Sequence, residues 1–152
     1  MASGMVDSIL NQLNALETGF DTEAVRIIED NAGFIIDMNL ETLYSGYNSK
    51  GQSLDSIGGS YSPVTIQIKR EKGQVTSHVT LKDTGSFYDG FFLKASDGLW
   101  KISSTDDKTQ GLIRDWGADI FGNTEMDEQE INIRYILPGL IEWIMLNLSL
   151  RK

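Results

Sequence analysis

The sequence predicts an α+β fold in a single domain that spans residues 1–152. This length is typical of one domain with one hydrophobic core. Apolar residues recur at helical spacing near both ends of the chain and alternate with polar residues between them. These observations predict two N-terminal helices, a central antiparallel β-sheet with hairpins, and a C-terminal helix bent at Pro138.

Two helices are expected at the N-terminus. Thr18-Gly19 is expected to end the first helix, and Asp21 or Thr22 can cap the second. The apolar positions are Met5, Val6, Ile9, Leu10, Leu13 and Leu16 in the first helix, and Val25, Ile28, Ala32, Ile35, Met38 and Leu43 in the second.

The segment 46–81 is expected to project from the domain as a loop followed by a hairpin. Residues 46–62 are rich in Gly, Ser, Asn and Gln, and loops of this length in compact domains are often functional. From Val64 the apolar period changes to two. It is interrupted at Glu71-Lys72-Gly73-Gln74 and resumes at Val75.

A second hairpin follows an aromatic run, Phe87, Tyr88, Phe91 and Phe92, that is typical of a strand. A two-residue turn at Asp97-Gly98 would pair Ala95 with Trp100, Leu93 with Ile102, and Phe91 with Ser104. One face is then apolar, as a half-buried sheet requires. The same register places Lys94 opposite Lys101, which is mildly unfavourable unless an acidic group lies nearby.

The last third of the chain carries clear helix signals. Asp106 or Asp107 can cap a helix that Gly117 ends in a left-handed conformation. Ile120-Phe121-Gly122 is expected to lie extended on the core. Thr124 can cap the final helix, whose acidic first turn opposes the positive end of the helix dipole.

Composition excludes several classes of function. The chain has a net charge of −9, which argues against specific nucleic-acid binding because such surfaces cluster Lys and Arg. It has no cysteine, and so neither a disulfide nor a cysteine metal site. The charge is divided: residues 61–114 hold eight bases and six acids, whereas both flanks are acidic. In an assembly, this division would let the centre of one subunit meet an acidic flank of another.

We expect no enzyme activity and no cofactor or metal. His78 is the only histidine, so a Ser-His-Asp triad or a zinc site lacks its ligands. Asp83-Thr84-Gly85 matches the aspartic-protease triplet, and a homodimer could supply both carboxylates. That fold, however, is nearly all β, whereas long helices are expected at both ends of this chain. Asp83 or Thr84 is instead expected to bond backbone amides at a turn that Gly85 permits. The sequence contains no nucleotide-binding glycine motif.

The order of motifs between residues 81 and 135 resembles that of the virion-morphogenesis, or tail-completion, proteins of tailed bacteriophages. In that family an L-x-D-T-G segment, here Leu81 to Gly85, precedes a β-hairpin. An aromatic-Gly pair, here Trp116-Gly117, and an F-G, here Phe121-Gly122, then precede a closing helix. Gly85, Gly117 and Gly122 would be turn positions. The chain differs from the common pattern by its long acidic N-terminus and by the insertion at 46–80.

This resemblance implies a structural virion protein of the phage neck. Subunits of the family form or join a ring at the portal-tail junction, bridge capsid and tail, and help retain the genome. The expected partners are further copies in a ring of six or twelve, the portal, and tail or other neck proteins. The expected location is the virion neck, after assembly in the host cytoplasm.

The last helix is expected to be an interface anchored by Trp143. Apolar residues including Leu140 and Ile144 surround nearly its whole circumference, and one core covers a single stripe. The alternative is that this helix runs through the core. Lys94 and Lys101 are further interface candidates. The run 133–150 contains Arg134 and Glu142, and Pro138-Gly139 interrupts it, so we expect no membrane span and no secretory signal.

Two other classes of function fit the same residues. A small acidic protein-binding module, such as an inhibitor or immunity protein, would share the charge but bind its partner as a monomer. An enzyme that uses carboxylates would lose activity, and keep its fold, on substitution of one aspartate.

Overall fold

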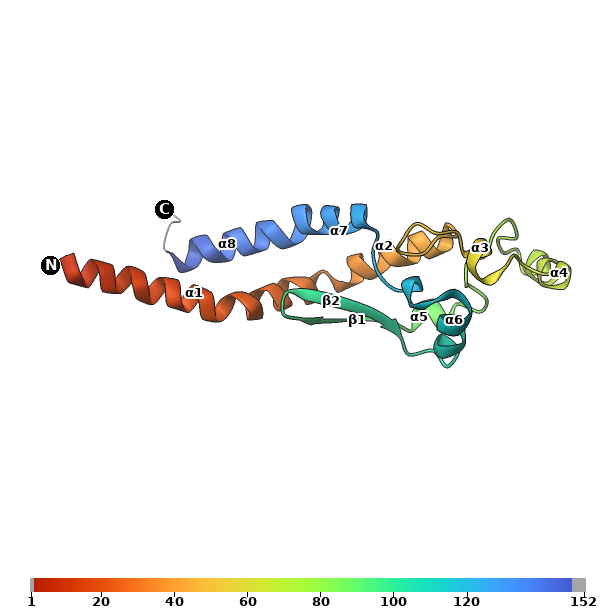
Figure 1. Ribbon diagram of the computed structural model, residues 1–152, viewed down its shortest axis with the longest axis horizontal. Helices are drawn as coiled ribbons and strands as arrows, with labels where there is room; N and C mark the ends of the chain where they lie inside the picture. Colours follow the sequence, from red (N-terminus) through yellow and green to blue (C-terminus); the bar gives the residue numbers. More distant parts are fainter. Residues whose placement is uncertain (1, 149–152) are drawn as a thin grey trace.

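The computed structural model describes residues 2–148, and side chains from residue 4 onward. The molecule is elongated, with both described ends of the chain at one end and the helix α4 at the other (Figure 1). The predicted α+β class is confirmed: helices dominate, and a single two-stranded antiparallel sheet accompanies them in the described part of the chain.

Helix α1 (Ala2–Asp30) is continuous, so the predicted break at Thr18-Gly19 is wrong. Gly19 lies in the helix interior, where its missing side chain makes room for Trp143. The break falls at Asn31 instead, whose side-chain amide donates to the carbonyl of Ile27, 2.8 Å away. Helix α2 (Ala32–Tyr44) then continues in the same general direction (Figure 1).

The second hairpin forms with the predicted register. Strands β1 (Phe91–Ser96) and β2 (Leu99–Ser104) are antiparallel and place Lys94 opposite Lys101. Asp97 and Gly98 both have positive φ, 52° and 70°, as a type I′ turn requires. Phe87 and Tyr88 are not part of a strand, because they lie in the short helix α5 (Ser86–Asp89).

The predicted hairpin at 64–81 is wrong. Residues 63–71 form helix α4 (Pro63–Glu71), and the loop before it contains helix α3 (Leu54–Gly58). Ser62 caps α4 by accepting from the backbone N–H of Thr65, and Pro63 occupies the first turn, where its missing N–H costs nothing. Gly73 ends the turn after α4 with a φ of 65°, and 75–85 contains no strand. Helix α4 lies at one end of the molecule (Figure 1).

Helix α6 (Thr109–Trp116) lies where the sequence places it. Its N-cap position is Lys108, which makes no side-chain cap hydrogen bond, so the predicted cap at Asp106 or Asp107 is wrong. Asp106 lies just before the helix and accepts from the backbone N–H of Lys108, 2.8 Å away. Gly117 ends α6 with φ 87° and ψ 164°, a conformation that favours glycine but is extended rather than left-handed helical. The 3₁₀ turn η1 (Ala118–Ile120) leads on to the final helices.

The C-terminal helix is interrupted before the predicted proline. Thr124 and Asp127 form a capping box on α7 (Glu125–Ile131), as the Thr124 cap predicts. A π-helical segment, η2 (Asn132–Ile136), joins it to α8 (Leu137–Asn147), which has Pro138 in its first turn. Because Pro138 has no N–H to donate, the hydrogen-bonding pattern changes around it.

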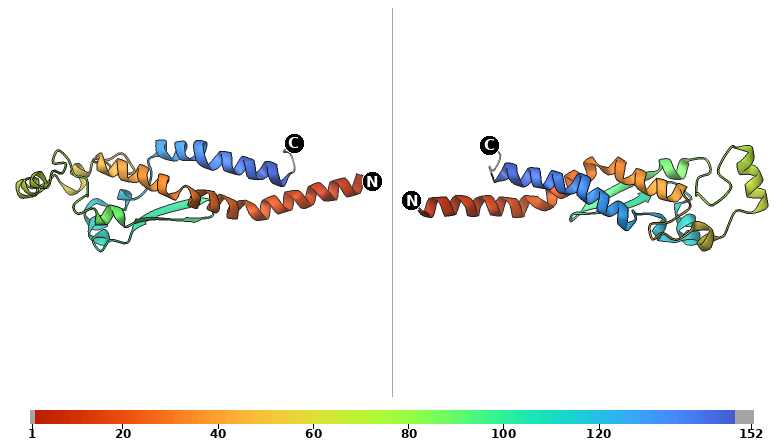
Figure 2. Two further views of the ribbon diagram at one scale, coloured as in Figure 1. Left: turned by 180° about the vertical axis from the view of Figure 1, so that it is seen from behind. Right: turned by 90° about the horizontal axis from the view of Figure 1, so that it is seen from above.

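Two clusters of buried side chains form the core. The first is formed by side chains of α1, α2, β2, α7, η2 and α8: Ala24, Ile27, Ile28, Ile35, Ile102, Ile131, Ile136 and Leu140. The second lies under α5 and α6: Leu43, Leu54, Val79, Phe87, Tyr88 and Ile120. α8 runs beside α1, and the hairpin lies against another side of α1 (Figure 2).

Candidate functional site

Trp143 lies half-buried against α1. Its ring stands edge-on to Phe20, with the ring centroids 6.4 Å apart, and covers Gly19. Leu140 is 9% exposed and packs in the first core cluster. Within one copy of the chain it is therefore a core residue and does not lie at an exposed surface. Ile144 is half-buried. The helix α8 therefore presents one apolar side to its own domain, and Trp143 lies at the edge of that contact.

Another side of α8 is apolar and exposed. The helix α1 is also apolar and exposed over its first half, with large side chains that are 48% to 70% exposed. We call these residues together the terminal apolar surface, because α8 and the first half of α1 lie at the same end of the molecule (Figure 2). Its members are Met5, Val6, Ile9, Leu10, Leu13, Ile141, Met145 and Leu146.

Lys94 and Lys101 face each other on the exposed side of the hairpin, and the structure does not bring them to Trp143. Lys94 Nζ lies 5.7 Å from the centre of the Phe92 ring. Neither lysine forms an ion pair with the described residues. Their role as interface residues stays a prediction.

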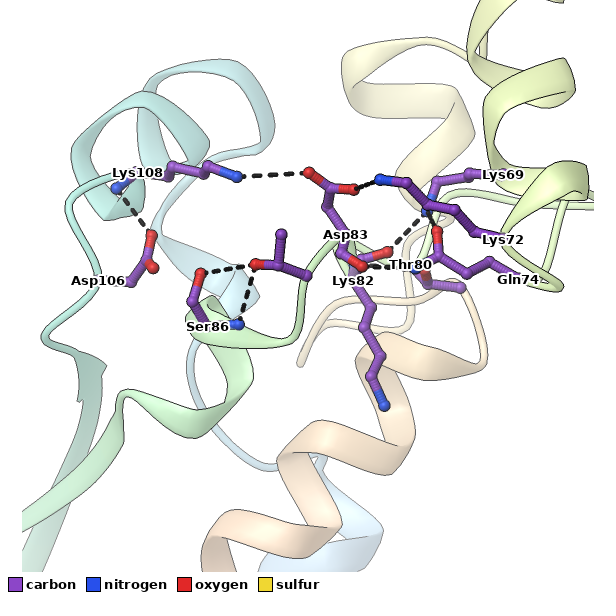
Figure 3. A network of polar contacts seen from close by, with 10 residues as sticks. Lys69, Lys72, Gln74, Thr80, Lys82, Asp83, Ser86, Asp106 and Lys108 are labelled. Atoms are coloured by element: carbon purple, nitrogen blue, oxygen red, sulfur yellow. Dashed lines mark hydrogen bonds and ion pairs between the residues drawn. The ribbon is translucent and has the colours of Figure 1, made fainter.

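Asp83 joins two helical elements that are distant in sequence. Its carboxylate accepts from Lys72 Nζ at 2.9 Å, next to the end of α4, and lies 3.5 Å from Lys108 Nζ, next to the start of α6 (Figure 3). The hydrogen bond from Lys72 is the main reason why the pKa of Asp83 lies below its ordinary value. Of the two residues expected to bond a backbone amide at this turn, Asp83 pairs with lysines, and Thr84 makes the amide contact.

Thr84 and Gly85 do form the predicted turn. Thr84 Oγ1 accepts from the Ser86 N–H and donates to Ser86 Oγ, at 3.4 and 3.0 Å. Gly85 precedes α5 with a φ of 98°. This conformation is costly for residues with a side chain, so glycine is required here. Gly122, another predicted turn position, has a φ of 119°.

A pocket of about 450 Å³ lies between α4, the Asp83 loop and α6. Lys69 lines it and is only 6% exposed. Lys69 Nζ donates to the carbonyl of Lys82 at 2.6 Å and to Gln74 Oε1 at 3.3 Å (Figure 3), and it lies 4.8 Å from the centre of the Tyr61 ring. Sequence reasoning missed this residue, because a period of two placed it on a strand.

The side chains with catalytic potential have structural contacts. His78 Nε2 lies 2.8 Å from the carbonyl of Tyr44, and Nδ1 lies 2.9 Å from Ser77 Oγ. Asp83 is the one acidic side chain among the residues that line the pocket, and an aspartic-protease site needs two, so a single copy of the chain does not supply the pair. Within residues 4–148, no three His, Asp or Glu side chains are grouped so that they would hold a metal ion.

A buried amide network holds the segment before α7 in place. Asn39 donates to the carbonyl of Ile120 at 3.1 Å and accepts from the N–H of Gly122 at 3.0 Å. Asn123 donates to the carbonyl of Ile35 and accepts from Trp100 Nε1. These contacts connect α2, the hairpin and the Phe121-Gly122 segment. They therefore fix the relative positions of the elements that carry the recognisable motifs.

Comparisons with protein-family models, curated proteins and solved structures find no match to this chain. Over the described residues, every helix is too short or too polar to cross a bilayer.

Proposed function

We propose that this chain is a structural subunit of the head-to-tail junction of a tailed bacteriophage. It forms or joins a ring of six or twelve copies beneath the portal and bridges capsid and tail. The proposal rests on the order of motifs from Leu81 to Thr124 and on the terminal apolar surface. Its location would be the virion neck, reached after assembly in the host cytoplasm.

The terminal apolar surface is the observation that carries the proposal. It contains eight large apolar side chains, each at least 39% exposed, on two helices at one end of the molecule. Large exposed apolar patches on soluble proteins mark sites that another surface covers. We assign this surface to contact with neighbouring copies, which is the contact that a ring needs.

The Asp83-Thr84-Gly85 motif has an architectural role in this proposal. Asp83 connects the ends of α4 and α6, and Gly85 starts α5. The motif therefore links the α4 end of the molecule to α6 and α5, and this proposal gives it no chemistry on a substrate.

Light scattering over a series of concentrations tests the proposal, together with electron microscopy of the largest species. We expect concentration-dependent oligomers that include closed rings, and no hydrolytic activity. A strict monomer with a catalytic turnover that Asp83→Asn abolishes would overturn it. A strict monomer that binds one partner in a 1:1 complex would favour an acidic binding module instead.

A further inference from the structure

The pocket beside Asp83 is positively charged in a chain that is strongly acidic. Four lysines line it, Lys69, Lys72, Lys82 and Lys108, against the single acid Asp83. The whole chain has 13 Lys and Arg residues and a net charge of −9. The lining of this pocket is therefore opposite in sign to the chain as a whole. Lys69 Nζ is bonded in the interior, and Lys82 Nζ points away from Asp83 and lies over the rings of Tyr44 and Tyr88 (Figure 3). At the rim, Asp83 pairs with both Lys72 and Lys108, so one net positive charge remains there. Such a site favours an acidic occupant.

The lining of the pocket is largely apolar. Leu81, Leu112 and Trp116 contribute to it, together with Ile68 of α4, which is 47% exposed. The volume of about 450 Å³ lies within the range of about 300–1,000 Å³ for ligand pockets. An occupant that fits has an apolar side chain for the interior and carboxylates for the rim.

The start of α7 has this combination of side chains. Met126 is 80% exposed, more than any other large apolar residue of the described chain. Exposed glutamates flank it at positions 125 and 128, whereas the capping box engages Asp127. Methionine is flexible, and its sulfur makes favourable contacts with aromatic rings such as that of Trp116.

Resting on the proposed ring, we propose that the pocket of one copy receives Met126 of a second copy, with Glu125 and Glu128 placed against Lys72 and Lys108. None of the residues that line the pocket, all within the described chain, belongs to α7, so the two surfaces are separate patches. A contact between two different patches is heterologous, and repetition of such a contact closes a ring when the rotation permits.

Disulfide trapping tests this contact directly, because the full chain has no cysteine of its own. The variant Ile68→Cys/Met126→Cys is oxidised gently at a concentration where the wild-type chain is oligomeric. Every linkage between the two positions joins different copies, so we expect a ladder of dimers, trimers and longer species. The matched control is Leu99→Cys/Met126→Cys, since Leu99 is exposed on the hairpin outside the pocket. It should give no such ladder.

Charge reversal is a second test of the proposed contact. Glu125→Lys/Glu128→Lys places like charges against the lysine rim and should weaken association at least ~10-fold. Glu29→Lys/Glu41→Lys changes the net charge equally on exposed positions of α1 and α2 and should leave association unchanged. Circular dichroism checks that both variants fold.

The outcomes separate this contact from the ring itself. An oligomer that forms without the ladder, and that Glu125→Lys/Glu128→Lys leaves intact, overturns the contact and keeps the ring. A wild-type chain that stays monomeric at every concentration removes the ring and the contact together.

Discussion

Gly19 and Trp143 lie so close that a Cβ atom at residue 19 would be 2.9 Å from Cζ2 of Trp143. A second close approach occurs further along the same two helices, where a Cβ at Gly139 would lie 2.9 Å from Cδ1 of Ile27. A glycine on α1 and a glycine on α8 therefore each accept a large side chain of the other helix. This exchange lets α8 lie close against α1.

Gly19→Ala should destabilise the protein although alanine is the better helix former. The added methyl group overpacks against Trp143, which costs about 1–3 kcal/mol. The gain in helix propensity offsets about 1 kcal/mol of this loss. We expect a net loss of about 1 kcal/mol, which thermal unfolding would report as a decrease of about 2–4 °C.

Two further variants test the cause. Gly33→Ala is the matched control, because a Cβ there meets nothing within 4 Å, and it should raise stability by about 0.5–1 kcal/mol. Trp143→Ala should cost about 1–3 kcal/mol, less than a fully buried tryptophan. In the Trp143→Ala background, Gly19→Ala should become neutral or stabilising. If it remains equally destabilising there, contact with Trp143 is not the reason for Gly19.

Asn39→Ala should be among the most destabilising single changes in α2. Asn39 is fully buried, and its loss leaves the carbonyl of Ile120 and the N–H of Gly122 without their partner. The expected cost is about 2–4 kcal/mol in chemical unfolding. Asn11→Ala, on the exposed side of α1, controls for the loss of an amide and should change stability little. A small effect at Asn39 would mean that water replaces its hydrogen bonds.

The sequence predicts a local feature well where one or two residues strongly favour a single backbone conformation. Asp97-Gly98 favours one turn, and this turn determines the whole register of the hairpin. Thr124 with Asp127 determines the start of α7. The helix end predicted at Gly19 is wrong because a glycine that ends a helix cannot be distinguished in the sequence from a glycine that makes room for a neighbouring helix. At 64–68, the alternation of apolar and polar residues predicted a strand. Ser62-Pro63, which is a typical helix start, indicates the helix that forms.

The candidate surfaces were only partly predictable. The excess of apolar residues in the last helix indicates a second contact, and Ile141, Met145 and Leu146 are exposed as this requires. The sequence does not show which apolar residues of that helix face its own core and which are exposed. For this reason Leu140 was expected at an interface. The lysine pocket draws on α4, the Asp83 loop and α6. Only tertiary packing brings these segments together, and no local pattern reports it.

Asp83→Asn should have a small effect on stability that depends on pH. The pKa of Asp83 is lowered in the folded state, so its charge contributes stability above the unfolded pKa of about 3.9, and this is lost as pH falls through the lower folded value. Both ion pairs are about half exposed, which limits the effect at pH 7 to about 1 kcal/mol or less.

Urea unfolding at several pH values measures this difference. The wild-type advantage over Asp83→Asn should be constant near neutral pH and should shrink below about pH 4. Asp119→Asn, an exposed carboxylate in η1, controls for the loss of one negative charge. An advantage that grows on acidification would contradict the assigned ion pairs.

Hydrogen exchange should distinguish the two ends of the molecule. Backbone amides of α4 should exchange faster than those of residues 24–30 of α1, which contribute three side chains to the first core cluster. On assembly, α4 should gain protection, because the proposed contact covers the pocket beside it. Equal protection of α4 in the free and assembled states would argue against its position at an interface.

The most direct test of the ring proposal is the mass of the particle formed by two surface variants, measured by sedimentation velocity. Ile141→Glu/Leu146→Glu places charges on the terminal apolar surface at exposed positions of α8. We expect it to keep the wild-type melting temperature and to remain a monomer where the wild-type chain is oligomeric. Leu99→Glu changes an apolar position on the hairpin that is 70% exposed, and it should assemble like the wild type. Full assembly of Ile141→Glu/Leu146→Glu would contradict the assignment of this surface to contacts between copies.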